Sequence, residues 1–249
     1  MKLLYTILFF ASFTTTVAAQ FVQEAKITYE RKINQWKKVE ADMDENESDQ
    51  WYNFFKKNNP QYKIDSFALT IKNNTTSYVP LGDEVTDKNN WWSNDPATRN
   101  EVFTNYNNDT RIASKAIFED QLLIADSIKK LTWKITNETK IIGGFECRKA
   151  TAKIMDSVFV IAFYTDQIMI TGGPESFSGL PGCILVVSIP RLYATWQANA
   201  IQLKAIKDAE MVMPKNGKKI NTKQLNDKLK SSVGKWGKWG QKYIHLINV

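Results

Sequence analysis

Imidazole side chains carry most metal sites and much acid–base catalysis, and this sequence has a single histidine, His245. A catalytic triad needs an imidazole beside a nucleophile, and a metal site needs several ligands. The segment Tyr243–Ile247 is apolar around His245, and we predict a polar position on a terminal strand. The sequence therefore favours neither a metal centre nor a His-dependent enzyme, and we expect no cofactor.

Carboxylates are the remaining candidates for catalysis, because two of them in different environments can divide acid and base roles. Most acids lie in polar stretches of the chain, and no two are marked as buried partners. The least unfavourable pair is Asp166 and Glu175, beside and within a glycine-rich segment. A hydrolase that uses these two acids is therefore the last of three functional hypotheses.

The chain has two cysteines, Cys147 and Cys183. In an oxidising compartment an even number of cysteines is consistent with one disulfide. The alternative is two separate buried thiols that pack as small apolar side chains. Pairing requires Cα atoms within about 7 Å of each other. Both interpretations stay open on the sequence.

A segment from Gly172 to Gly182 holds four glycines and two prolines within eleven residues, directly before an apolar strand. Proline restricts φ and glycine accepts positive φ, so this segment must be a loop of fixed shape. Such a loop can present a ligand site or form the corner of a curved sheet, and the residues favour the corner. The residues that would bind a ligand there are Gly173, Pro174, Glu175, Gly179, Leu180, Pro181 and Gly182.

The elements that position these residues are predicted to be short strands. Alternating or β-branched segments bounded by turn residues predict strands at 21–32, 62–79 (with a turn at Asn73-Asn74 before Thr75), 112–118, 121–126, 132–136, 138–142, 145–154, 158–164, 183–189 and 194–203, with a further short strand near 102–106 in a long loop. Helical spacing predicts one or two helices between Asn34 and Lys57, and a helix capped by Asn221 that buries Leu225 and Leu229. We therefore predict a mainly β (α+β) fold, a curved antiparallel sheet or partial barrel with a few helices.

The first nineteen residues have the pattern of a secretory signal peptide. A short basic start precedes an apolar run that continues to Phe13, and Val17 and Ala19 supply the small residues of a cleavage site before Gln20. No apolar run has the ~20 residues of a spanning helix, and no cysteine near the cleavage site could carry a lipid. We expect a periplasmic or secreted protein without a transmembrane segment, with a single domain over residues 20–249.

The C-terminal part of the chain is strongly basic. From Leu203 onward, eleven lysines stand against three acids, whereas the whole chain has a formal charge of +7. This part contains no arginine, so we predict a solvated lysine-rich face and no nucleic-acid partner. The segment Gly234–Gly240 interleaves lysine and tryptophan, which favours tryptophans that cover the core over a stacking platform for bases or sugars.

The glycine-rich loop resembles the defining motif of the GLPGLI family of exported Bacteroidetes proteins. The pattern reads Gly173-Pro174-Glu175-x-x-x-Gly179-Leu180-Pro181-Gly182-x-Ile184-Leu185, and segments 133–135, 142–151 and 163–165 are similar to those that precede the motif in that family. Cys183 stands where leucine is usual and Val186 where an acid is common, so a Cys147–Cys183 bridge would be particular to this chain. The resemblance implies an envelope role near outer-membrane receptors, with no defined activity.

Three functions are consistent with these features. The first is a non-enzymatic envelope protein that binds a lipid or other apolar ligand in a large, mostly apolar cleft lined by aromatic residues. The second is a module that docks on a TonB-dependent outer-membrane receptor through an exposed aromatic patch, for which Trp91 and Trp92 are candidates. The third is the carboxylate hydrolase.

Overall fold

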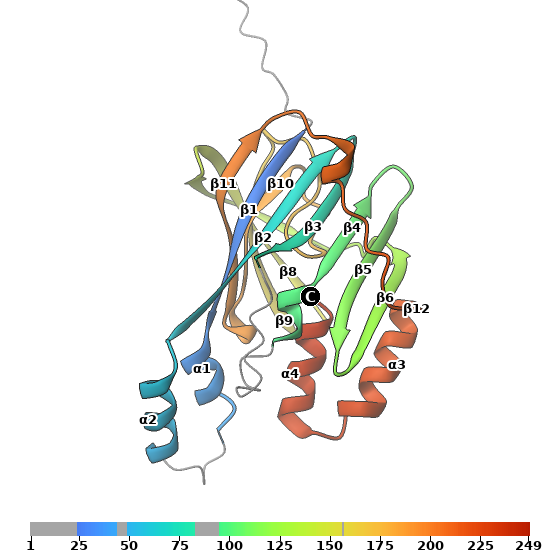
Figure 1. Cartoon of the computed structure of the whole chain (residues 1–249). Helices are drawn as coiled ribbons and strands as arrows, with labels where there is room; N and C mark the ends of the chain where they lie inside the picture. The colour runs from blue at the N-terminus through green and yellow to red at the C-terminus, as the bar shows by residue number, and fades with distance from the viewer. Residues whose placement is uncertain (1–23, 44–48, 83–94, 156) are drawn as a thin grey trace, which may run out of the picture.

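The computed structural model describes residues 24–43, 49–82, 95–155 and 157–249 (Figure 1). The predicted signal peptide, Trp91 and Trp92 lie outside the described residues. The strands are β1 (Ala25–Asn34), β2 (Tyr62–Lys72), β3 (Thr75–Leu81), β4 (Glu101–Asn105), β5 (Thr110–Ile117), β6 (Asp120–Ser127), β7 (Lys134–Ile142), β8 (Phe145–Ile154), β9 (Val158–Thr165), β10 (Cys183–Ile189), β11 (Ala194–Leu203) and β12 (Lys218–Ile220). The helices are α1 (Gln35–Glu40), α2 (Asp49–Asn58), α3 (Thr222–Val233) and α4 (Gly237–Ile247), with 3₁₀ turns η2 (Pro96–Arg99), η3 (Pro190–Leu192) and η4 (Asp208–Glu210).

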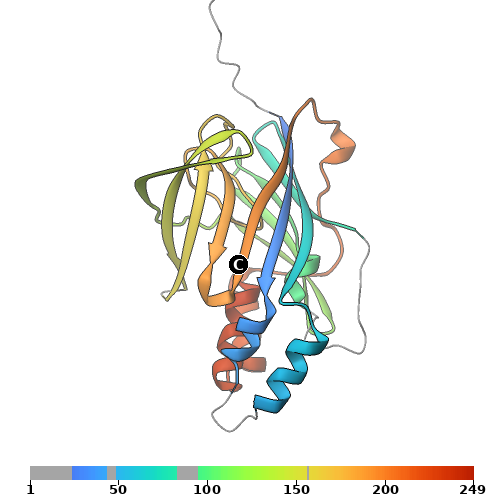
Figure 2. The ribbon, with the colours of Figure 1, turned by 90° about the vertical axis from the view of Figure 1, so that its left-hand side faces the viewer.

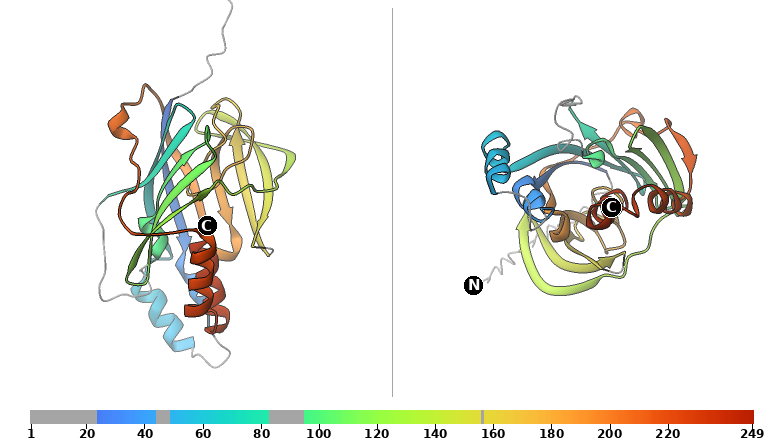
Figure 3. Two further views of the ribbon diagram at one scale, coloured as in Figure 1. Left: turned by 90° about the vertical axis from the view of Figure 1, so that its right-hand side faces the viewer. Right: turned by 90° about the horizontal axis from the view of Figure 1, so that it is seen from below.

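The described strands form one twelve-stranded sheet in the order β12-β6-β5-β4-β3-β2-β1-β11-β10-β9-β8-β7. Neighbouring strands are antiparallel, except that β12 runs parallel to β6. Seen from below, the sheet curls into an incomplete ring whose edges are β7 and β12, and α4 lies across its mouth (Figure 3). Helices α1 and α2 lie beyond the lower ends of β1 and β2 (Figure 2).

Strand β1 shows why the sequence folds into this sheet. Ala25, Ile27, Tyr29, Arg31 and Ile33 are buried on one face, while the intervening residues are half-buried or exposed. This period of two is what a strand with one face toward the core requires. Arg31 is the one charged residue in the buried row, so the fold must supply it with partners.

Two local predictions, the turn at Asn73-Asn74 and the helix cap at Asn221, are confirmed by the backbone and hydrogen-bond geometry. Asn73 and Asn74 join β2 to β3 with φ of 48° and 56°, a left-handed conformation that asparagine tolerates in tight turns. At the start of α3, the Asn221 side chain accepts a hydrogen bond from the Gln224 N–H at 2.8 Å, and the Gln224 side chain accepts from the Asn221 N–H at 2.9 Å. This reciprocal pair is a capping box and fixes where the helix begins.

The prediction of a mainly β fold with a curved antiparallel sheet and a few helices is confirmed. Two segments differ from their predictions. Residues 132–136 and 138–142 do not form two strands, because β7 continues across both with a shifted pairing between Ile135 and Thr139. The segment around His245 is helical and not a strand, since a short apolar run fits both periods until its packing is known.

The concave side of the sheet is filled by the chain itself. Ile168, Ile170, Phe177 and Leu180 of the β9–β10 loop, together with Leu246 of α4, belong to the main buried apolar cluster. A smaller cluster joins the buried faces of α3 and α4 to β5 and β6. None of the helices within the described ranges has the length and apolar character needed to cross a bilayer.

Candidate ligand-binding cleft

The glycine-rich loop crosses the interior of the partial barrel. It leaves β9, and at Gly172 it lies so close to β3 and β4 that an added Cβ would be 2.6 Å from the Tyr106 hydroxyl and 3.3 Å from the Thr76 methyl group. The Ile184 N–H then donates to the Gly172 carbonyl at 2.8 Å, which returns the loop to β10. The loop thus packs between the β3–β4 side of the sheet and β10, which is consistent with a structural role.

Glycine is required at the end of this loop. Gly182 has φ of +143°, and a Cβ there would lie 2.0 Å from the Thr165 carbonyl oxygen. Gly179 also has positive φ, and the neighbouring Ser178 carbonyl accepts a hydrogen bond from the Trp133 indole at 2.9 Å. The loop therefore holds its path through backbone conformations that other residues would strain.

Glu175 is carried by the loop into the core, where it is 3% exposed. Its backbone has φ of 54°, and its Oε2 accepts a hydrogen bond from the Asn100 amide at 2.9 Å. Its Oε1 is buried with no hydrogen-bond partner among the described residues. Burial raises the pKa of Glu175, and attraction to Lys115 only partly opposes this shift.

A buried ion-pair cluster lies beside Glu175. Arg31 on β1 donates from Nη1 to Asp65 Oδ2 at 3.3 Å and from Nη2 to Asp95 Oδ2 at 2.5 Å. Asp65 is the cross-strand neighbour of Arg31 on β2. Burial is the largest single influence on Asp95 and opposes its ionisation, but attraction to Arg31 and Lys38 and the hydrogen bonds from Ala97 and Arg31 together outweigh it, so the pKa of Asp95 is lowered. These charges are partnered inside the core.

A cleft of about 670 Å³ opens between β5–β6 and α3–α4. The residues that line the cleft follow the side-chain periodicity of the strands and helices that carry them. Alternate residues of β5 face it, as do residues of α3 and α4 spaced three or four apart. These are Arg111, Ala113 and Lys115 from β5, Thr222, Asn226 and Lys230 from α3, and Gln241, His245 and Asn248 from α4 and its end.

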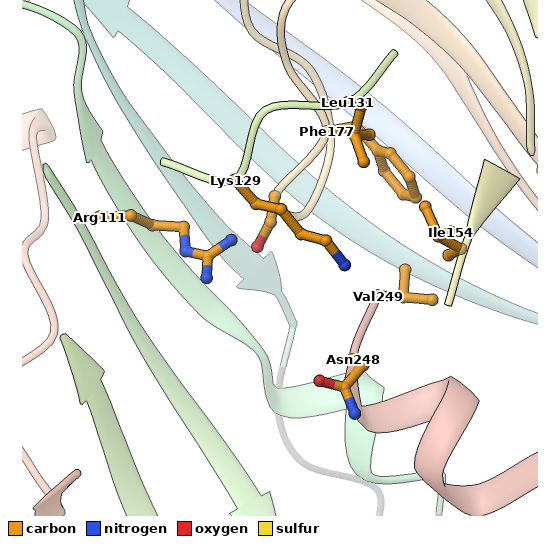
Figure 4. A pocket seen from close by; sticks show the side chains of 8 residues that line it. Arg111, Lys129, Leu131, Ile154, Phe177, Asn248 and Val249 are labelled. Carbon is orange, nitrogen blue, oxygen red and sulfur yellow. The ribbon is translucent and has the colours of Figure 1, made fainter. Parts of the chain in front are cut away.

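The polar lining of this cleft is dominated by positive charge. Four basic side chains line it, Arg111, Lys115, Lys129 and Lys230, against a single acid, Asp126. A narrower part lies where Arg111, Lys129 and Asn248 face the apolar side chains of Leu131, Ile154, Phe177 and Val249 (Figure 4). The lining therefore combines a cationic side with a small apolar side.

Arg111 and Asp126 are cross-strand neighbours, yet they do not form an ion pair within the described part of the chain. Asp126 uses its oxygens on backbone donors: Oδ2 accepts from the Thr222 N–H at 3.1 Å, and Oδ1 accepts from the Ser127 N–H at 2.9 Å. The Arg111 Nε is buried without a hydrogen-bond partner among the described residues. Burial lowers the pKa of Arg111, and only long-range attraction to Asp126 and Tyr106 opposes this.

Lys115 and His245 form the inner wall of the cleft. Lys115 is buried, and its Nζ donates to the main-chain oxygens of Ile247 at 2.8 Å and Val249 at 3.1 Å, which fixes the end of α4. Burial lowers the pKa of Lys115 to about 8, against the attraction of Glu175 and with repulsion from other cations. His245 is 6% exposed, its Nδ1 has no hydrogen-bond partner among the described residues, and burial lowers its pKa.

The residues predicted to form a site in the glycine-rich loop lie mostly in the core. Gly173, Pro174, Glu175, Leu180 and Gly182 are buried, whereas Gly179 and Pro181 are exposed. Only Ser176 and Phe177 of this loop line the cleft or its narrower part. A ligand-binding role for the loop itself stays a prediction, and the packing observed here is consistent with the corner role.

Asp166 and Glu175 lie in different surroundings. Asp166 is exposed at the turn that follows β9, where its Cα lies beside Gly182. Glu175 is enclosed and bonded to Asn100 on the opposite wall. In the part of the chain that the structure describes, no group of three or more His, Cys, Asp or Glu side chains is arranged to hold a metal ion.

Both cysteines are buried free thiols in the structure. Cys147 lies on β8 and Cys183 on β10, and β9 runs between them. Two strand spacings amount to roughly 10 Å, above the limit of about 7 Å for a disulfide, so the sheet would have to rearrange to form a bridge. Burial raises the pKa of Cys147 to about 11 and that of Cys183 to about 12. The disulfide remains a prediction.

The cleft differs from the one expected for a carrier of apolar ligands. Among the described residues, no Phe, Tyr or Trp side chain lines its main volume, and the charged side chains in the lining are mostly basic. Sequence patterns gave little sign of this cleft, because β5 and α3 are more than a hundred positions apart in the chain. The one local signal was a pair of basic residues at alternating spacing, Arg111 directly before the strand predicted at 112–118 and Lys115 within it.

Comparison with known proteins assigns the chain to a family. Residues 83–230, more than half of the chain, match the family described as "N-glycanase peptide, N-terminal domain". The chain belongs to this family. No curated protein is similar to the sequence.

Two crystal structures of PNGF-II, in space groups C2 and P21, share the fold of this family member. Their TM-scores are 0.52 and 0.50, both at 16% sequence identity. The similarity covers 82% and 83% of this chain but only 32% and 33% of the PNGF-II chains. The chain therefore spans about a third of the length of PNGF-II, and at this identity the likeness concerns the fold alone.

Proposed function

We propose that this chain is an exported, non-enzymatic binding protein of the cell envelope, of the GLPGLI type, and that its ligand occupies the cleft between β5–β6 and α3–α4. The observation that carries the proposal is the cleft itself, which is lined by residues of β5, β6, α3 and α4 and includes Arg111, a guanidinium with no ion pair among the described residues. Its volume lies in the range typical of small-molecule sites.

Family membership supports a binding role. The matching family is an N-terminal domain, and the chain corresponds in length to a third of PNGF-II, which is consistent with a module that supports a larger activity elsewhere. The interior that an acyl chain would need is filled by the β9–β10 loop and α4. We therefore place the ligand in the cleft and not on the concave face of the sheet.

Asn226 offers a direct test, because it is half-buried and lines the cleft. Native mass spectrometry of protein from its own envelope should show a bound ligand that is lost in Asn226→Trp. Ser232→Trp, at an exposed position of the same helix outside the cleft lining, should retain it. Equal ligand content in the two variants, or no bound ligand in the unmodified protein, would contradict the proposal.

A second candidate function is docking on an outer-membrane receptor, and an exposed aromatic cluster favours it. Phe118 is 48% exposed and stacks on Tyr243 at 5.1 Å between ring centroids, and Trp236, 52% exposed, contacts Phe118 edge-on at 6.1 Å. A photo-crosslinking residue at position 118 should then label a receptor in living cells, whereas one at Ser232 should not. Equal labelling from both positions would rule out this surface.

A further inference from the structure

The cleft contains a guanidinium group that the fold does not neutralise. Its cross-strand acid, Asp126, is committed to the N–H groups of Thr222 and Ser127. Arg111 is half-buried and its Nε has no hydrogen-bond partner within the described residues. A partly buried charge without an ion pair is costly, and an anion held in the cleft beside the guanidinium would offset that cost.

The other charged side chains that line the cleft also favour an anionic ligand. Lys129 and Lys230 also line the cleft, and Lys115 lies behind them with its donors directed at main-chain oxygens of residues 247 and 249. The field inside the cleft is therefore positive and is not cancelled by Asp126 alone. Walls of low dielectric strengthen such a field and attract anions.

Neutral polar groups complete a binding surface. Figure 4 shows Arg111, Lys129 and the Asn248 amide around one space, with Phe177 and Val249 on its apolar side. A guanidinium presents paired donors that match the two oxygens of a carboxylate or phosphate, and an amide donor can add a third bond. The small apolar side has room for a short non-polar group and not for an acyl chain.

We infer that the cleft binds a small ligand through an oxyanion, a carboxylate or a phosphate, with Arg111 as the principal contact and Lys129 and Lys230 as supporting charges. This inference rests on the proposed binding function and names the chemical class of its ligand. A neutral ligand would leave the guanidinium without a counter-charge, so the same cleft should discriminate against uncharged analogues of equal shape.

The probe for this inference is the Nε–H resonance of Arg111, assigned by its disappearance in Arg111→Gln. Titration with acetate or phosphate should shift this resonance, and acetamide, which has the shape of acetate without its charge, should not. The two anions compared at equal ionic strength distinguish a carboxylate from a phosphate preference. High sodium chloride should weaken either titration by screening.

The loss of anion affinity should be largest for variants of Arg111 and smaller for variants of the surrounding lysines. Isothermal titration calorimetry with acetate or phosphate compares the variants, because Arg111→Gln removes the NMR probe itself. Arg111→Gln should weaken anion binding about tenfold or more, since hydrogen bonds to charged groups contribute about 1.5–3 kcal/mol. Arg111→Lys, which keeps the charge without the paired donors, should recover part of the loss. Lys230→Gln should weaken binding a few fold, and Lys223→Gln, an exposed lysine of the same helix paired with Asp227, should leave it unchanged.

The outcomes separate this inference from the function on which it rests. Loss of the native ligand in Asn226→Trp but full retention in Arg111→Gln, with no anion response at Arg111, would overturn the oxyanion assignment and leave the binding function in place. An anion response that persists in Asn226→Trp would place the anion outside the cleft and overturn the inference. Equal shifts with acetate and acetamide would overturn it as well.

Discussion

Two arginines of this protein stand opposite an aspartate on the neighbouring antiparallel strand, and the fold treats them differently. Arg31 on β1 faces Asp65 on β2, and Arg111 on β5 faces Asp126 on β6. Arg31 is completely buried and bonded to Asp65 and also to Asp95. The guanidinium of Arg111, in contrast, has no carboxylate at ion-pair distance within the described residues.

The difference lies in the third group that contacts each arginine–aspartate pair. Asp95 arrives beside Arg31 from the segment before η2, so Arg31 gains a second carboxylate and can be buried. Asp126 instead receives the first N–H of α3, where a carboxylate is favoured by the helix dipole. The same cross-strand motif thus becomes a structural ion pair in one place and an open cationic site in the other.

The largest expected effect comes from breaking the Arg31 cluster. Asp95→Ala leaves a buried arginine with the half-buried Asp65 as its one remaining carboxylate at ion-pair distance among the described residues. Removing one partner costs about 3–5 kcal/mol in comparable buried pairs. Urea denaturation should show this loss in the free energy of unfolding. Asp208→Ala, which removes an exposed partner of Lys72, should leave the free energy of unfolding nearly unchanged. Similar values for both variants would show that the Arg31 cluster is not structural.

The loop that brings Glu175 into the core gives the next largest effect. Gly182→Ala places a Cβ against the Thr165 carbonyl in addition to the strain of positive φ, so we expect a loss of at least about 2 kcal/mol. Gly144→Ala also has positive φ, but its Cβ would meet nothing within 4 Å, and a loss of about 1 kcal/mol is expected. Equal losses in thermal or urea denaturation would contradict the packing role of the loop.

Lys115 interacts electrostatically with both Arg31 and Arg111, and its burial makes the free energy of unfolding dependent on pH. Its pKa is about 8 in the folded protein and 10.5 in its ordinary state, so between these values the unfolded chain holds more protons and stability rises with pH. The free energy of unfolding of Lys115→Met should lack this rise. The difference in free energy of unfolding between the two proteins should therefore shrink by up to about 1.4 kcal/mol per pH unit in this window. Tyrosines and cysteines titrate alike in both proteins, so the difference isolates Lys115. A constant difference from pH 7 to 10 would contradict the lowered pKa.

The smallest effect on stability is expected at Arg111. Since Arg111 has no ion pair among the described residues, Arg111→Gln should lower the free energy of unfolding by no more than about 0.5 kcal/mol. Arg31→Gln should be far more destabilising, because it leaves Asp95 buried without the cation that pairs with it. A large loss in Arg111→Gln would mean that Arg111 is structural and that the contrast between the two arginines is wrong.

Much of the fold follows from the sequence alone. The alternation in β1, the Asn73–Asn74 turn and the Asn221 cap are local signals, and each predicts the geometry that the structure shows. The glycines of the β9–β10 loop likewise predict a fixed path, because φ is a property of single residues. Local sequence failed around His245, where a few apolar residues fit either a strand or a helix.

The cleft and the fate of each charge were decided only by tertiary structure. Arg111, Asn226 and His245 come from β5, α3 and α4, and nothing in their neighbouring residues indicates that they line one space. Glu175 could be singled out from its loop, but not its burial against Asn100. Periodicity depends on residues adjacent in the chain, whereas burial and ion pairing depend on which distant segments meet.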